Sequence, residues 1–391
     1  MTRTENCLKK LKRMNTALAH QEPDRVPFSD FFWLTFIKRW QEELGLSKDA
    51  SPYYHYDLDW IVTTPNMDPH IKNFEIISDN DGDMLVRTGF EALIRHRDGS
   101  QMPYFEHFET DTIDKMIAFQ FDDPWDERRF FKGGDNQIAG VSEIITRNTP
   151  PWIDTVKSLH PDFPVYGSVC EGHEEGWRII GSENMMMWMG LYPEELGKFL
   201  KRVNEFNLEL VKAQIEAAGG MLDGMVIWGD VAYVNGMLFS PEFWRQHLKP
   251  GVKAIIDYCH SKNIPAIYHG CGNASVLYPD FIEIGLDAYN PLEAKSGLNV
   301  VDIRKQYGHK MGFCGNIDSL NWANAPLDEL KAEVLTKLNA AKGGGYIVQS
   351  DHSVPSNVSA ERYEFVVNLM KEYGNYPLEL GAWDIPDMKG S

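Results

Sequence analysis

Short apolar runs alternate regularly with helical segments from about residue 160 onward. Each run is continuously apolar, which is typical of parallel strands that are buried on both faces. The alternation predicts repeated βα units around a parallel sheet. Six runs have the length of strands: Pro164–Val169, Gly224–Gly229, Ile264–His269, Asp287–Asn290, Lys310–Gly315 and Tyr346–Ser350.

The first part of the chain supplies two more candidate strands. Arg25–Asp30 follows a basic amphipathic helix, and Asp59–Thr64 is a second run that has the composition of a buried strand. Eight strands with right-handed connections predict an α/β fold, a (β/α)₈ TIM barrel.

Residues 70–125 have a different pattern. Phe74–Arg87 and Ala92–Phe108 resemble antiparallel pairs around Asp81-Gly82 and Asp98-Gly99, which are hairpin turn signals. We expect this region to be an N-terminal antiparallel β insertion. Residues 1–391 are then a single TIM-barrel domain that carries the insertion.

Charge and cysteine content narrow the classes of function. The formal net charge is −19 and no lysine- or arginine-rich run occurs, so neither nucleic acid nor an anionic membrane is an expected partner. The N-terminal segment has no apolar core of a signal peptide, and no stretch is apolar enough to span a bilayer. Five scattered cysteines argue against a disulfide framework. We therefore expect a cytoplasmic protein.

Polar side chains cluster where the predicted strands end. In a barrel the C-terminal ends of the strands share one rim, which is where functional groups gather. Because six strands deliver such residues, the pattern predicts an active site at this rim. The segments are Cys170–His173, Trp228–Asp230, His269–Asn273, Asn290–Glu293, Cys314–Asp318 and Ser350–Ser353.

His269-Gly270-Cys271 is the sharpest element of this set. Residues i and i+2 of a strand point to the same side, so the imidazole and the thiol can meet one ion. Glu293 follows the next strand, and either Asp351 or His352 offers a fourth ligand. Imidazole, thiolate and carboxylate together favour Zn²⁺. Taken alone, H-x-C is equally compatible with a structural histidine beside a buried thiol.

Two further acids and several aromatic residues lie near the same rim. Asp230 and Glu171 are candidates for positioning a substrate or donating a proton, and each is equally compatible with a solvated or helix-capping acid. Aromatic residues near the rim, Trp228 among them, either line a pocket for an aryl or other organic substrate or belong to the core.

Several segments resemble the uroporphyrinogen decarboxylase superfamily. They are Pro23–Pro27, Trp228–Asp230 followed by Ser240–Trp244, the H-x-C-G-N segment, and the Ser350–Pro355 turn. The resemblance covers nearly the whole chain and implies a barrel. The superfamily includes porphyrinogen decarboxylases and zinc-dependent methyltransferases that serve corrinoid proteins or coenzyme M.

The resemblance favours the methyltransferase branch. Family decarboxylases use no metal and bind substrate carboxylates with arginines after the first strand, where this chain has Ser29–Leu34 without arginine. Methyltransferases of the family bind zinc through H-x-C, in some members a later Glu, and a distal Cys. His269, Cys271 and Glu293 match this pattern, whereas Asp351 and His352 stand at the turn of the distal cysteine.

The leading hypothesis is a zinc-dependent methyltransferase. It would move a methyl group from a small organic donor, such as an O-methyl compound, to a corrinoid carried by a partner protein or to a thiol; a homodimer is one assembly that we consider. The alternatives are a decarboxylase-like lyase and a binding barrel whose catalytic set has decayed. A neutral donor predicts that Arg178, Arg245 and Arg304 do not converge beside Asp230.

Overall fold

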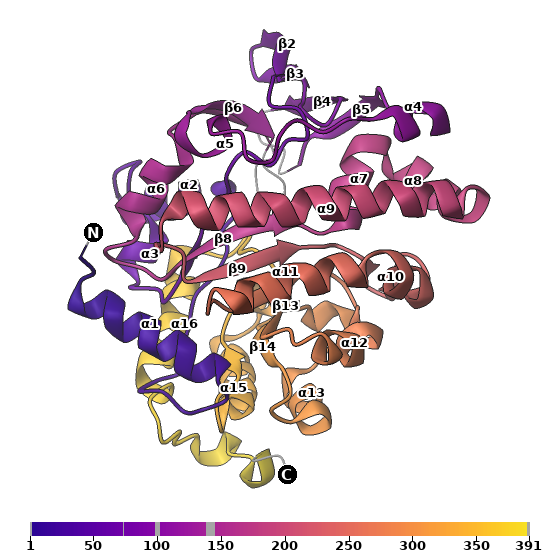
Figure 1. The fold of residues 1–391 in the computed structure, drawn as a ribbon. Helices are drawn as coiled ribbons and strands as arrows, with labels where there is room; N and C mark the ends of the chain where they lie inside the picture. Colours follow the sequence, from indigo (N-terminus) through magenta and orange to yellow (C-terminus); the bar gives the residue numbers. More distant parts are fainter. Residues whose placement is uncertain (1, 73, 98–101, 138–144, 389–391) are drawn as a thin grey trace.

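A parallel sheet forms the centre of the computed structural model, which describes residues 2–72, 74–97, 102–137 and 145–388 (Figure 1). Within this part of the chain, seven strands are hydrogen-bonded in sequence order. They are β1 (Ile61–Val62), β8 (Val165–Cys170), β9 (Gly224–Trp228), β12 (Ala266–His269), β13 (Ala288–Leu292), β14 (Gly312–Gly315) and β15 (Tyr346–Ile347). The predicted TIM-barrel architecture is confirmed.

An extended segment closes the sheet at the place of the eighth strand. The amide of Val348 donates to the carbonyl of Pro27 at 2.9 Å, and the amide of Asp59 donates to the carbonyl of Phe28 at 3.0 Å. The prediction of a regular strand over Arg25–Asp30 is wrong, because this segment makes only isolated bridges to its neighbours. Proline has no N–H to give to a ladder, which is one reason for the broken pairing.

The buried carboxylate of Asp59 secures this closure. It is 0% exposed and accepts hydrogen bonds from Arg13, Arg25 and the amide of Phe28. A buried carboxylate is stable only when its oxygens are paired in this way. The contacts tie the first helix, the closing segment and the start of β1 together.

Helices surround the sheet, and their ends follow ordinary capping rules. In α10, for example, Ser240 accepts a hydrogen bond from the amide of Phe243, and Pro241 occupies the first turn. The longer helices are α1 (Glu5–Leu18), α2 (Leu34–Leu44), α6 (Trp152–Leu159), α7 (Gly172–Ile180), α8 (Ser182–Leu191), α9 (Pro193–Ala218), α10 (Pro241–His247), α11 (Lys249–Ser261), α13 (Val300–Tyr307), α15 (Leu327–Leu338) and α16 (Ala360–Tyr373). The shorter ones are α3 (Pro52–His55), α4 (Ile113–Ala118), α5 (Arg128–Phe131), α12 (Tyr278–Glu283) and α14 (Ser319–Asn324). Single 3₁₀ turns span Ser275–Leu277, Ala294–Ser296, Asn339–Ala341, Gly381–Trp383 and Pro386–Met388.

The predicted insertion is a four-stranded antiparallel sheet at the top of Figure 1. Asp81 and Gly82 have φ values of 44° and 86°, the left-handed pair that a tight hairpin turn requires. The second predicted turn, Asp98-Gly99, lies outside the described residues. Phe105 contacts Trp177 of α7 with ring centroids 5.3 Å apart, so the sheet rests on the helix that follows β8. Its strands are β2 (Glu75–Asn80), β3 (Asp83–Arg87), β4 (Ala92–Arg97) and β5 (Tyr104–Phe108).

Two small hairpins were not predicted from the sequence. One pairs β6 (Gly134–Gln137) with β7 (Ile145–Thr149), and the other pairs β10 (Ala232–Tyr233) with β11 (Gly236–Met237) in the loop after β9. Strands this short carry too few residues for an alternating pattern to stand out. Among the described helices, none combines the length and the apolar character needed to cross a lipid bilayer.

Candidate metal centre

The register of three neighbouring strands sets the geometry of the rim. β12 pairs in parallel with β9 on one side and β13 on the other, and His269 lies opposite both Trp228 and Asn290. Side chains at the same level of adjacent strands point to the same face of the sheet. An indole, an imidazole and an amide therefore stand side by side where these strands end.

His269 and Cys271 bring their donor atoms together. Nε2 of His269 lies 3.7 Å from Sγ of Cys271. Two such donors on one tetrahedral zinc ion, at bond lengths of about 2.1 and 2.3 Å, would be about 3.6 Å apart. The spacing of this pair therefore fits a shared zinc ion.

A hydrogen-bonded chain fixes the orientation of His269. Nδ1 of His269 lies 2.6 Å from Oδ1 of Asn290, whose Nδ2 donates to Oε1 of Gln349 at 2.5 Å. Because the amide nitrogen of Asn290 is engaged by Gln349, its oxygen faces the imidazole and accepts from Nδ1–H. Burial lowers the pKa of His269 to about 4. The neutral ring thus directs the lone pair of Nε2 toward Cys271, as a metal ligand requires.

Two groups of potential ligands share Cys271. Asp230, His269 and Cys271 form one group, and Cys271, Glu293 and His352 form the other; within each, the ligand atoms lie within 4.8 Å of one another. Glu293 follows β13 and His352 follows β15, so four strand ends contribute to the centre. Burial raises the pKa of the Cys271 thiol well above its usual range. A bound cation would favour its thiolate form.

Asp351 and His352, the two candidates for the fourth ligand, make different contacts in the structure. The carboxylate of Asp351 is 0% exposed and accepts hydrogen bonds from the amides of Ala294 at 3.2 Å and Ser319 at 2.9 Å. Within the described residues, Asp351 belongs to neither ligand group. Its contacts are those of an anchor between the loops that follow β13 and β14, whereas His352 is the residue beside Cys271.

The two acids predicted as catalytic residues lie in different surroundings. Oδ1 of Asp230 accepts from the amide of Cys271 at 2.8 Å, and burial raises the pKa of Asp230 to about 7. Glu171 caps α7 by accepting from the amide of His173, and burial raises its pKa to about 8. Of these two acids, Asp230 belongs to a ligand group, whereas Glu171 caps α7 and also accepts from the hydroxyl of Tyr268 at 3.5 Å.

A buried ion pair beside Asp230 was missed by the sequence analysis. Arg178 donates to Glu174 at 2.6 Å, and the two side chains are only 4% and 6% exposed. Besides burial, the charge of Glu174 raises the pKa of Asp230 and the charge of Arg178 lowers it. The sequence did contain a signal for this pair, because Glu174 and Arg178 are four residues apart in the helix that follows β8.

The three arginines do not converge beside Asp230. Arg178 is paired with Glu174, and Arg245 bonds Asp280 at 3.0 Å. The guanidinium of Arg304 donates to backbone carbonyls, including that of Gly344 at 2.9 Å. No cluster of arginines for a polycarboxylate exists at this centre within the described residues.

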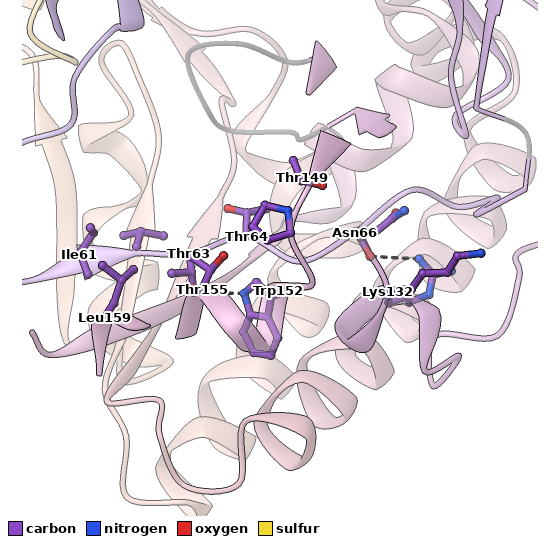
Figure 2. Close-up of a pocket in the computed structure, with 12 residues that line it drawn as sticks. Ile61, Thr63, Thr64, Asn66, Lys132, Thr149, Trp152, Thr155 and Leu159 are labelled. Atoms are coloured by element: carbon purple, nitrogen blue, oxygen red, sulfur yellow. Dashed lines mark hydrogen bonds between the residues drawn. The ribbon is translucent and has the colours of Figure 1, made fainter. Parts of the chain in front are cut away.

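A separate pocket of about 320 Å³ lies against β1 and α6. Figure 2 shows Thr63 and Trp152 in its wall, where the indole N–H donates to the threonine hydroxyl at 3.2 Å. None of its described lining residues belongs to either ligand group. The pocket is therefore distinct from the candidate centre.

A family model and one solved structure agree with this architecture. The model of the uroporphyrinogen decarboxylase (URO-D) family matches residues 155–373, more than half of the chain. A methyltransferase from Methanosarcina mazei superposes with a TM-score of 0.65 at 17% identity, covering 93% of this chain and 98% of that chain. A protein titled as a vitamin-B12-independent methionine synthase, from Listeria monocytogenes, gives 0.39 at 12% identity, with 58% and 71% covered. No curated protein matches the chain.

Replacing Asn290 with leucine should weaken zinc binding about ten- to a hundredfold, because the imidazole loses the partner that fixes its tautomer. Competition with a chromogenic chelator measures the affinity. Asn324→Leu is the matched control, since the exposed side chain of Asn324 donates to the carbonyl of Leu320 within α14, away from the candidate centre. Equal zinc affinity in Asn290→Leu and the unmodified protein would show that this hydrogen bond does not position a ligand.

The buried carboxyl group of Glu175 should make the free energy of unfolding depend on pH. Its side chain is 0% exposed, and burial raises its pKa from 4.5 to about 8, although the charge of Arg178 and a hydrogen bond with Cys170 oppose the shift. The folded protein binds this proton more tightly than the unfolded chain. The contribution of Glu175 to the free energy of unfolding is therefore fully present below pH 4.5. It is lost as the pH rises toward 8, by at most roughly 1.4 kcal/mol per pH unit.

Glu175→Gln should remove this dependence and make the protein more stable than the unmodified form at pH 9. Chemical denaturation at pH 5 and pH 9 measures the difference. Glu205→Gln, on an exposed face of α9, should change nothing. The same pH dependence in both variants would contradict the assignment to Glu175.

Proposed function

Because the chain belongs to the uroporphyrinogen decarboxylase family, we propose that its rim site makes it a zinc-dependent methyltransferase that acts on a small organic donor. The observation that carries the proposal is the pair of His269 Nε2 and Cys271 Sγ at 3.7 Å, with Glu293 and His352 around the same thiol. The fold that it shares with a Methanosarcina methyltransferase supports the same conclusion.

His269, Cys271, Glu293 and His352 are the residues that would hold the ion. Two imidazoles, a thiolate and a carboxylate suit zinc better than magnesium or calcium, which prefer oxygen ligands. Bound zinc would supply Lewis acidity, which polarises the atom that carries the methyl group or lowers the pKa of a thiol.

The remaining residues of the site hold and position these ligands. Asn290 presents the correct nitrogen of His269, and Asp230 fixes the backbone of Cys271 through its amide. The Glu174–Arg178 ion pair sets the charge around Asp230. We further propose that the methyl acceptor is a corrinoid on a partner protein, or a thiol, which approaches the open rim.

Two observations weigh against the alternatives. A decarboxylase that binds a polycarboxylate needs converging cations, whereas of the three arginines only Arg178 lies beside Asp230, where it is paired with Glu174; Arg245 and Arg304 are engaged elsewhere. A decayed barrel would not be expected to keep His269 in the one tautomer that a metal needs. We therefore favour methyl transfer over both.

Cys271→Ala should lower the zinc content of the purified protein about tenfold or more, because this thiolate belongs to both ligand groups. Methyl transfer to a reduced corrinoid, followed by visible absorbance across ethers, amines and thioethers, should fall with it. Elemental analysis gives the zinc content directly.

Cys314→Ala is the matched control. Cys314 is a fully buried thiol on β14, two strands away from β12, and belongs to neither ligand group. It should keep its zinc and its activity. Retention of full zinc and activity by Cys271→Ala, with both variants folded, would refute the proposed site.

A further inference from the structure

We propose that the pocket against β1 and α6 is a second ligand site, which binds a small monocarboxylate with an elongated apolar body. The inference does not depend on the proposed function, because none of the described lining residues belongs to either ligand group. It follows from the volume of the pocket, the separation of its polar and apolar ends, and the charge at the polar end.

The pocket has the size of a small-molecule site. Its volume is about 320 Å³, within the range of roughly 300–1,000 Å³ that is usual for ligand pockets. One wall is β1 with the residues that follow it, and another is α6 with Thr149 and Pro150 before it. The residues just after β1 and α5 complete the lining. A ligand here would therefore contact parts of the chain that are distant in sequence.

The two ends of the pocket differ in polarity. In Figure 2, Ile61 and Leu159 lie at one end, Trp152 lies between, and Asn66 and Lys132 lie at the other end. Ile61 and Leu159 are only half-buried, so part of their apolar surface is left uncovered. An apolar chain that lies along this end would remove that surface from water, which is favourable.

Unused hydrogen-bond donors lie at the polar end. Oδ1 of Asn66 accepts from the amide of Asp68 at 2.9 Å, which orients the side-chain amide. Nδ2 of Asn66 then has no acceptor within the described residues, and the exposed ammonium of Lys132 forms no ion pair with them. An amide N–H and an ammonium both donate, so a negatively charged oxygen is their complement.

The charge at the polar end favours a ligand with a single negative charge. Arg129 also lines the pocket, but its Nε and Nη1 donate to the carbonyls of Asp123 at 3.0 Å and Asp68 at 2.7 Å. Burial lowers the pKa of Arg129, and the charges of Asp68 and Asp122 oppose this shift. Because these acids balance Arg129, Lys132 is the cation that remains for a ligand. One cation matches a carboxylate better than a doubly charged phosphate.

Acids are missing from the described lining, although the chain as a whole has a formal net charge of −19. An anion is therefore not repelled by the walls of the pocket itself. The pocket combines an anion-binding end with an apolar end, which is the complement of an alkyl or arylalkyl carboxylate.

Isothermal titration tests the ligand class, with octanoate as the probe. The protein should bind octanoate at least about tenfold more tightly than octanamide, which lacks the charge, and than butyrate, which has a shorter apolar body. Inorganic phosphate should bind more weakly than octanoate. Equal binding of octanoate and octanamide, or tighter binding of phosphate, would overturn the inference.

Substitutions at the polar end show where octanoate binds. Lys132→Gln removes the free cation and should weaken octanoate binding about five- to tenfold. Asn66→Asp keeps an oxygen for the amide of Asp68 but replaces the free N–H groups by a carboxylate, and should weaken it by at least about tenfold. Lys157→Gln is the matched control, because Lys157 is an exposed lysine of α6 that does not line the pocket. Thermal unfolding of each variant checks that it is folded.

Cys271→Ala separates this site from the rim, since a carboxylate is also a ligand for zinc. This variant should bind octanoate as the unmodified protein does. Loss of octanoate binding in Cys271→Ala, or unchanged affinity in both Lys132→Gln and Asn66→Asp, would contradict a site in this pocket. Octanoate binding by a protein that holds no zinc and moves no methyl group would refute the proposed function and leave the second site in place.

Discussion

The candidate centre depends on one row of backbone register. Trp228, His269 and Asn290 lie opposite one another on β9, β12 and β13, so the ring, the ligand and the group that orients the ligand arrive together. A shift of one residue in β12 would turn His269 to the other face of the sheet. The hydrogen bonds of a buried parallel sheet therefore specify the geometry of the site as well as the stability of the fold.

The loops beyond this row complete the site and depend on buried anchors. Cys271 is held by Asp230 through its amide, and the loop of Glu293 is tied to the next loop through Asp351. One of these anchors, Asp351, was expected as a metal ligand, and the other, Asp230, was expected as a catalytic residue. Some acids at the rim therefore hold loops in place, whereas others are available to bind an ion. The acids that hold loops are recognised by their hydrogen bonds to backbone amides.

Much of this arrangement was predictable from the sequence. Continuous apolar runs gave the order of the parallel strands, and polar residues at their ends indicated the rim that joins His269 with Cys271. Which of Asp351 and His352 lies beside Cys271 was not predictable, because it depends on the side chain that the turn after β15 directs inward. The Glu174–Arg178 pair was missed because a helical (i, i+4) pair normally lies on a solvated surface, whereas packing buries this one. The segment over Arg25–Asp30 has a strand-like composition, but its pairing is decided by neighbours that are distant in sequence.

The central claim is that one metal ion is held by a single thiolate together with imidazole and carboxylate groups. X-ray absorption at the zinc edge, on protein purified without added metal, measures the ligand set most directly. The account predicts one sulfur neighbour at about 2.3 Å and three nitrogen or oxygen neighbours at about 2.0–2.2 Å, with the multiple scattering of imidazole. A spectrum with no sulfur neighbour, with two or more, or without imidazole scattering would contradict it.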